Sequence, residues 1–175
     1  MVAPAATIPT SPTDTHPARI VVMCREGMMA GLLGAGTIAV WFLFLDGLLG
    51  RPFFTPSILG TALFRGIEAL VSPERQAISV AMVLLFTLMH GLIFCLLGLI
   101  AAWLVQFVER SPSFGFGIVL LVTVFMYGFI VFCMVFAEPV LRTVTWPAVL
   151  IGNLLATAAM VGYFWRCHPG LTMEP

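Results

Sequence analysis

The chain has 175 residues, of which 61% are hydrophobic and only 9% charged, and its eight basic and eight acidic residues cancel. A soluble protein of this size needs far more charged surface, and no basic run is present that would attract nucleic acid. The four cysteines are widely spaced and form no CxxC pair, which excludes the redox and metal motifs built on such pairs. The composition therefore predicts an integral membrane protein.

Four charge-poor apolar stretches define the predicted architecture. A helix needs ~20 mostly apolar residues to cross ~30 Å of hydrocarbon, and each stretch is long enough. Three of them carry no charged residue, and the first carries only Asp46. We predict an all-α fold, an antiparallel bundle of four transmembrane helices, with spans at 27–49, 77–107, 114–136 and 146–165.

Residues 1–25 are predicted to form a flexible, proline-rich N-terminal tail. Its prolines argue against a regular helix, and it lacks the apolar core of a secretory signal. The first span should open at Glu26, whose carboxylate suits a helix N-terminus. The transmembrane domain then covers 26–168, and 169–175 form a C-terminal tail. The prolines of the N-terminal tail are Pro4, Pro9, Pro12 and Pro17.

The connector between the first two spans is predicted to hold a short helix, Pro56–Phe64, lying along the membrane surface. Thr55 and Pro56 are typical of an N-cap and a first helical residue. A re-entrant arrangement of residues 51–72 stays open. Ser72 and Pro73 repeat the start signal, so the second helix is expected to begin there, before the hydrocarbon edge. The apolar face of the short helix would consist of Ile58, Leu59, Ala62 and Leu63.

An even number of spans places both chain termini on the same side of the membrane. The arginines divide evenly between the two sides, so the positive-inside rule is balanced over the whole chain. Arg19 and Arg25 precede the first span, which often dominates orientation. This favours cytoplasmic termini in a bacterial inner membrane.

Small residues recur at helix-packing spacing in three of the spans. Such stripes let helix backbones approach closely in lipid. Packing between helices of this chain is the default interpretation of the stripes, and an interface with a partner subunit is the alternative. Asn153 and Thr157, one turn apart, can add an interhelical hydrogen bond. The stripes are Gly27, Gly31 and Gly34; Gly91, Cys95, Gly98 and Ala102; and Gly152, Ala156 and Ala159.

His90 is the only ionisable group near the predicted bilayer midplane. An imidazole there is a candidate ligand for haem or a pigment metal. The alternative is a neutral histidine that hydrogen-bonds to a neighbouring helix, near Thr87 or Tyr127. His16 and His168 lie outside the spans, so a haem or pigment at His90 would need a partner chain. We predict no cofactor or metal site from this chain alone.

A second group of charged residues lies at one membrane face. Asp46 is about one turn from the end of the first span, Glu138 ends the third, and Arg51 and Arg142 lie on the same face. One interpretation is a gated proton or ion site. The other is an interfacial layer of ion pairs whose side chains snorkel to the headgroups. The second is favoured because neither acid lies deep in the membrane.

Several fragments of the chain carry a resemblance. They are Trp41-Phe42-Leu43 with Asp46, Gly50–Pro56 followed by Leu59-Gly60, and Trp146-Pro147 with Gly152-Asn153 and His168-Pro169. Together they resemble a set of small bacterial integral membrane proteins with four helices. The resemblance implies the four-helix fold, and it brings no activity with it.

Two function classes follow from these patterns. The first is a non-catalytic accessory or assembly subunit of a larger bacterial membrane complex, respiratory or photosynthetic, which would be a hetero-oligomer with other membrane subunits. The alternative is an autonomous small transporter or a proton- or ion-conducting oligomer that uses Asp46, Glu138 and His90. No nucleophile, base and metal ligand gather at one depth, so the chain is predicted not to be an enzyme.

Overall fold

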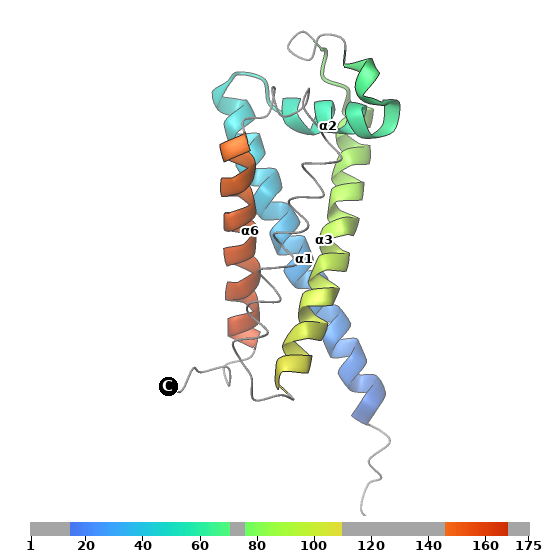
Figure 1. Ribbon diagram of the computed structural model, residues 1–175, viewed down its shortest axis with the longest axis vertical. Coiled ribbons are helices and arrows are strands. Elements are labelled where there is room, and N and C mark those ends of the chain that lie inside the picture. The colour runs from blue at the N-terminus through green and yellow to red at the C-terminus, as the bar shows by residue number, and fades with distance from the viewer. Residues whose placement is uncertain (1–14, 71–75, 110–145, 168–175) are drawn as a thin grey trace, which may run out of the picture.

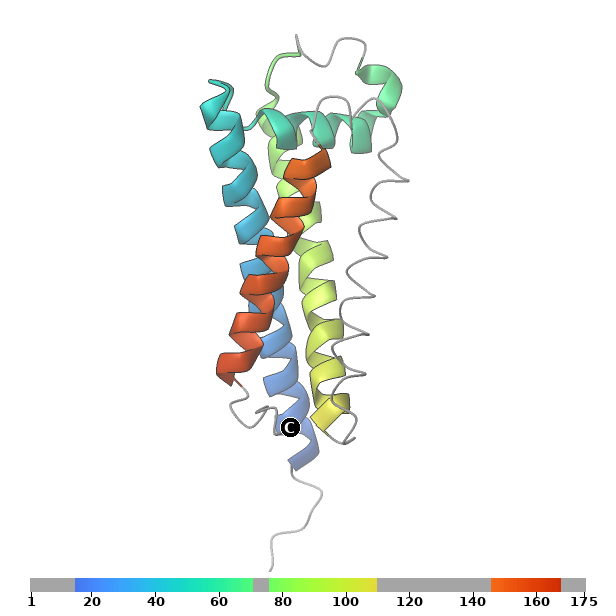
Figure 2. The same cartoon turned by 60° about the vertical axis from the view of Figure 1, so that its left-hand side comes forward.

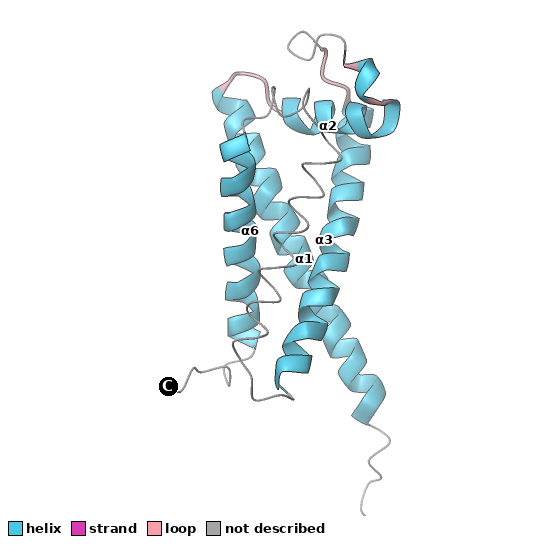
Figure 3. Ribbon diagram, viewed as in Figure 1, coloured by secondary structure: helices cyan, strands magenta, loops and turns pink. Residues whose placement is uncertain are grey.

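The computed structural model describes residues 15–70, 76–109 and 146–167, and these residues contain helices and no strands (Figures 1 and 3). The third predicted span, 114–136, lies outside them, so the four-span bundle stays a prediction. The described elements are α1 (Thr15–Leu48), α2 (Phe54–Arg65), the short 3-10 helix η2 (Ile67–Ala69), α3 (Val80–Glu109) and α6 (Trp146–Cys167).

Three of these helices are long and apolar enough to cross a membrane. Their apolar stretches are Arg19–Leu48, Val80–Gln106 and Pro147–Cys167, and each contains most or all of one predicted span. Large apolar side chains remain exposed on their outer surfaces, such as Val40 and Leu84. This pattern is compatible with an integral membrane protein, in which lipid covers the outer faces.

The three long helices run side by side, and α2 lies crosswise at one end of them (Figures 1 and 2). The start of α1 and the end of α6 lie at the opposite end, away from α2. The last residues of α3 also lie at that opposite end, whereas α6 begins at the α2 end.

Helix α1 begins earlier than the sequence predicted. It starts at Thr15 and has 34 residues, about 51 Å at 1.5 Å per residue. Pro17 falls in the first turn. Backbone amides there have no acceptor within the helix, so a proline at this position costs the helix no hydrogen bond. The prediction of a non-helical tail is therefore wrong for residues 15–25, and residues 1–14 lie outside the described part.

Helices α1 and α3 pack backbone against backbone through glycine. A Cβ on Gly31 would lie 2.7 Å from Cys95 Cα, and one on Gly98 would lie 2.7 Å from the backbone nitrogen of Gly31. A Cβ on Gly27 would lie 2.8 Å from Leu99 Cα. Such separations leave no room for a side chain, so the crossing depends on glycine at these positions.

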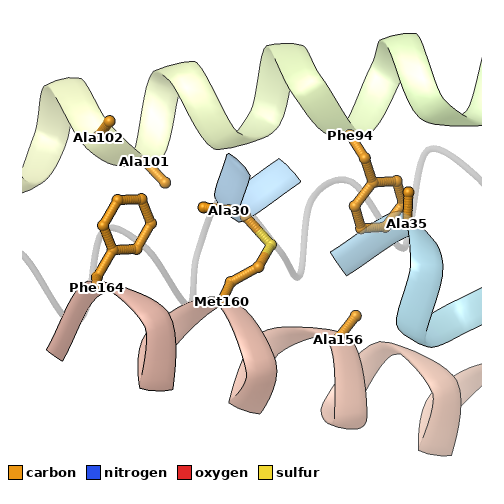
Figure 4. Packing of buried hydrophobic residues seen from close by; sticks show 8 residues of the cluster. All are labelled: Ala30, Ala35, Phe94, Ala101, Ala102, Ala156, Met160 and Phe164. Carbon is orange, nitrogen blue, oxygen red and sulfur yellow. The ribbon is translucent and has the colours of Figure 1, made fainter. Parts of the chain in front are cut away.

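The buried apolar residues form two clusters. The first, the upper cluster, is formed mainly by α2 and consists of Phe54, Ile58, Leu59, Ala62, Leu70 and Val149. The second, the lower cluster, fills the space between the three long helices (Figure 4). It consists of Ala30, Ala35, Phe94, Ala101, Ala102, Ala156, Met160 and Phe164. Five of these eight residues are alanine, and small residues let helices approach closely.

Helix α3 begins later than the sequence predicted. Residues 76–79 are not helical, and the helix starts at Val80 rather than at Pro73. The backbone amide of Ser79 donates to Ser57 Oγ at 2.9 Å, and the carbonyl of Gln76 accepts a hydrogen bond from Arg51 at 3.4 Å. These two hydrogen bonds hold residues 76–79 against α2 and the turn that precedes it, and these residues are not helical.

Candidate functional site

Asp46 has a buried carboxylate near the end of α1, with 3% of the residue exposed. Both of its oxygens accept hydrogen bonds from one residue. The backbone amide of Thr55 donates to Oδ2 at 2.7 Å, and the Thr55 hydroxyl donates to Oδ1 at 2.7 Å. These two short bonds satisfy the carboxylate within the chain itself.

Asp46 caps α2 from outside that helix. The residue before α2, Phe53, has a left-handed backbone with φ 66° and makes no side-chain cap. Phenylalanine has no acceptor for the free amides of a helix N-terminus, and the positive end of the helix dipole favours an anion there. Thr55 is therefore the second helical residue, not the predicted N-cap, and Asp46 supplies the acceptor.

Helix α2 contains the predicted short helix, Pro56–Phe64, and much of it is buried against the bundle, while its position at a membrane surface stays a prediction. Of the predicted apolar face, Ile58, Leu59 and Ala62 are buried, whereas Leu63 is 39% exposed. Gly60 fits against α3, because a Cβ there would lie 3.0 Å from the carbonyl carbon of Met82. The helix thus closes one end of the bundle.

Polar side chains of α2 join it to the segment before α3. Ser57 and Thr61 are almost fully buried, at 2% and 1% exposure. Ser57 accepts from the backbone of Ser79, and Gln76 Nε2 donates to Thr61 Oγ1 at 3.5 Å. We call Asp46, Thr55, Ser57 and Thr61 the polar cap. Sequence reasoning missed Ser57 and Thr61, although their spacing of four residues placed both on one helical face.

Arg51 lies beside the polar cap without joining it. Its guanidinium carbon is 3.8 Å from the ring centroid of Phe54, a cation–π contact, and Nη2 donates to the Gln76 carbonyl. In the predicted charge layer, the charged groups of Asp46 and Arg51 therefore have different partners. Glu138 and Arg142, the other half of that layer, lie outside the described residues.

His90 lies on α3 between two aromatic rings. The ring centroids of Phe86 and Phe94 are 5.6 Å and 4.7 Å from that of the imidazole. The Nε2 atom is buried and has no hydrogen-bond partner among the described residues. Thr87, one suggested partner, donates instead to the Val83 carbonyl at 2.7 Å. Tyr127, the other, lies outside the described residues.

Most of the predicted small residues face a neighbouring helix of this chain. They are Gly27, Gly31, Gly34, Cys95, Gly98, Ala102, Gly152 and Ala156. Ala159 is half-buried. Gly91 differs, because a Cβ built on it would meet no heavy atom of the described residues within 4 Å. Most of the predicted small residues thus pack between helices of this chain, and Gly91 has no such neighbour in the described part.

Trp41 of α1 joins α6 through a hydrogen bond that sequence reasoning missed. Its indole Nε1 donates to the Ala148 carbonyl of α6 at 2.8 Å. The ring covers Gly152, where a Cβ would lie 3.0 Å from Trp41 Cδ1. A tryptophan within an apolar span is the signal that was available, because its N–H needs an acceptor when no water is near.

Among the described residues, the hydrogen bonds of Asp46, Thr55 and Ser57 join α2 to α1 and to the segment before α3. No set of three or more His, Cys, Asp or Glu residues within the described part is placed to hold a metal ion. The carboxylate of Asp46 accepts from both the backbone amide and the hydroxyl of Thr55. No protein-family model, no curated protein and no solved structure matches this chain.

Proposed function

We propose that this chain is a non-catalytic accessory or assembly subunit of a larger bacterial membrane complex, respiratory or photosynthetic, that acts through helix–helix packing. The observation that carries the proposal is the state of Asp46. Both carboxylate oxygens are bonded to Thr55 at the start of α2. A carboxylate used to fix a helix is a poor carrier of protons or ions, because moving it would release that helix.

The open glycine of α3 supports the same proposal. Gly91 lies within the span, and no heavy atom of the described part of the chain lies within 4 Å of its Cβ position. Its neighbours Leu88 and Leu92 are 63% and 59% exposed. Glycine among large apolar residues lets another helix approach closely, which is what docking between membrane subunits requires.

The test is the mass of the native particle. The tagged full-length chain is extracted in mild detergent from its own host and separated by native electrophoresis with mass identification. We expect a hetero-complex, and we expect Gly91→Leu to shift the chain to low mass while its helix content stays normal. Gly162→Leu is the matched control, because Gly162 of α6 is equally open. A wild-type chain found only as a small homo-oligomer would refute the proposal.

The alternative is a small transporter or proton- or ion-conducting oligomer using Asp46, Glu138 and His90. One observation favours it: the Nε2 atom of His90 is buried and has no hydrogen-bond partner among the described residues. Liposomes containing only this protein would reveal it. Proton or solute flux that Asp46→Asn abolishes and Thr55→Val preserves would replace the accessory proposal. Thr55→Val removes one hydrogen bond from the polar cap but leaves the Asp46 carboxylate. Comparing the two variants therefore distinguishes a need for the carboxylate's charge from a need for the packing of α2.

A further inference from the structure

The turn between α1 and α2 carries large apolar side chains on its outer surface. Leu48 is 70% exposed, Leu49 75% and Phe53 48%, and we call these three residues the apolar turn. A turn that faces water is normally built from polar residues, glycine and proline. Leucine and phenylalanine side chains at these exposed positions therefore indicate contact with apolar surroundings.

The apolar turn continues an exposed face of α1 that lies within the span. Val40, Phe44 and Leu48 follow one another at steps of four residues, so they lie on one side of the helix. All three are exposed, as expected of side chains that lipid covers in a membrane-spanning helix. Asp46, the charged residue in this part of α1, is buried. The exposed apolar surface thus passes from the span into the turn.

The backbone of the turn is largely paired within the chain. Six of the seven backbone amides between Leu49 and Ser57 donate to acceptors of this chain, and Pro52 and Pro56 have no amide hydrogen. In hydrocarbon, backbone polar groups must be satisfied by the protein itself, because no water is present. A turn with this internal pairing is compatible with immersion in lipid. The six donors are Leu49, Gly50, Arg51, Phe54, Thr55 and Ser57.

The charged side chain of the turn is also engaged by the chain. Arg51 is half-buried, with its guanidinium carbon 3.8 Å from the ring centroid of Phe54, and Nη2 donates to the carbonyl of Gln76 at 3.4 Å. A long side chain of this kind keeps its stem among apolar groups while its charge reaches toward the head groups. The first exposed charged residues after the turn are Arg65, at the end of α2, and Glu68 in η2.

We propose that the apolar turn is immersed in the bilayer and covered by lipid acyl chains. Lipid is the occupant because the same exposed surface continues along α1 into the span, where acyl chains are its neighbours. The start of α2 then lies below the head groups, and the connector meets water at Arg65 and Glu68. Asp46 is shielded from water on the side of the turn. This inference concerns contact with lipid and does not depend on the accessory role.

The experiment measures how fast N-ethylmaleimide, which crosses membranes, labels cysteines introduced into the full-length protein. Maleimide reacts with the thiolate, which does not form in hydrocarbon. Leu49→Cys tests the turn, and Ala69→Cys is the matched control, because Ala69 is exposed in η2 beside Glu68. The protein is reconstituted alone into dioleoylphosphatidylcholine vesicles, and peptide mass spectrometry separates the introduced thiols from the native cysteines. Each rate is divided by the rate for the same variant unfolded in sodium dodecyl sulfate.

We expect Leu49→Cys to react at least about tenfold more slowly in vesicles than when unfolded, whereas Ala69→Cys keeps most of its rate. A rate for Leu49→Cys in vesicles close to its unfolded rate would overturn the proposal, because the turn would then face water. Protection that disappears when the protein is diluted in excess lipid would also overturn it, since a second copy of the chain would then cover the turn. If Leu49→Cys fails to fold, Leu48→Cys tests the same surface with the same outcomes.

Discussion

Replacing Gly98 with alanine adds one methyl group at the tightest contact between α1 and α3. The new carbon would lie 2.7 Å from the backbone nitrogen of Gly31 and 2.9 Å from its Cα, and it would overlap the Gly27 carbonyl. Ordinary contacts between non-bonded carbons are ~3.5–4.0 Å. All three obstacles are backbone atoms, so the strain cannot be relieved by turning a side chain and the helices must separate by about 1 Å.

The magnitude follows from comparison with a second glycine on the same helix. Overpacking of this kind typically costs about 1–3 kcal/mol. Alanine is also the better helix former by about 1 kcal/mol, but Gly91→Ala gains the same amount and meets no heavy atom within 4 Å. Helix propensity therefore cancels between the two variants. We expect Gly98→Ala to be less stable than Gly91→Ala by about 1–3 kcal/mol.

Unfolding by sodium dodecyl sulfate added to mild-detergent micelles, followed by far-UV circular dichroism, gives both free energies under one set of conditions. Gly91→Ala should match the wild type or exceed it. Equal stability of the two variants would mean that α1 and α3 do not meet at glycine, and the packing described for this pair would then be wrong.

Three further predictions use the same assay. Asp46→Ala removes both acceptors of Thr55 at a buried site and should lower the free energy of unfolding by about 1–3 kcal/mol. An unchanged free energy of unfolding would contradict the capping role. Trp41→Phe removes the hydrogen bond to Ala148 and should cost about 0.5–1.5 kcal/mol, with the near-UV signal of the ring lost as well. Gly60→Ala should cost about 1–3 kcal/mol, because its methyl group meets the backbone of α3's first turn; wild-type stability would show that α2 is free to move.

The positions of the long helices were predictable because the bilayer imposes a minimum length of apolar chain. The predicted spans 77–107 and 146–165 differ by only a few residues from α3 and α6. The start of α1 was not predictable in the same way. Proline is a helix breaker in general, but Pro17 lies in a first turn, and sequence alone does not show where that turn begins.

The candidate site was predictable in its residues but not in its pairings. Asp46 was recognised as an interfacial acid, yet its partner depends on the turn that reverses the chain between α1 and α2. That turn has left-handed backbone at Gly50 (φ 69°) and Phe53 (φ 66°). Left-handed phenylalanine is rare, so the reversal has no ordinary sequence signal. The surroundings of His90 likewise depend on which helices pack against α3, and composition does not reveal that.

The way α2 is held determines when it can form during biogenesis. It has 12 residues, and isolated helices of that length are marginal in water. The first turn of α2 is capped by Asp46 of α1. The upper cluster, to which α2 contributes four residues, also includes Val149 of α6, the last described helix. We therefore expect α2 to reach its final packing only after α6 has been inserted. A segment made early in synthesis thus becomes one of the last to be ordered, and a ribosome stalled before α6 should leave it sensitive to protease.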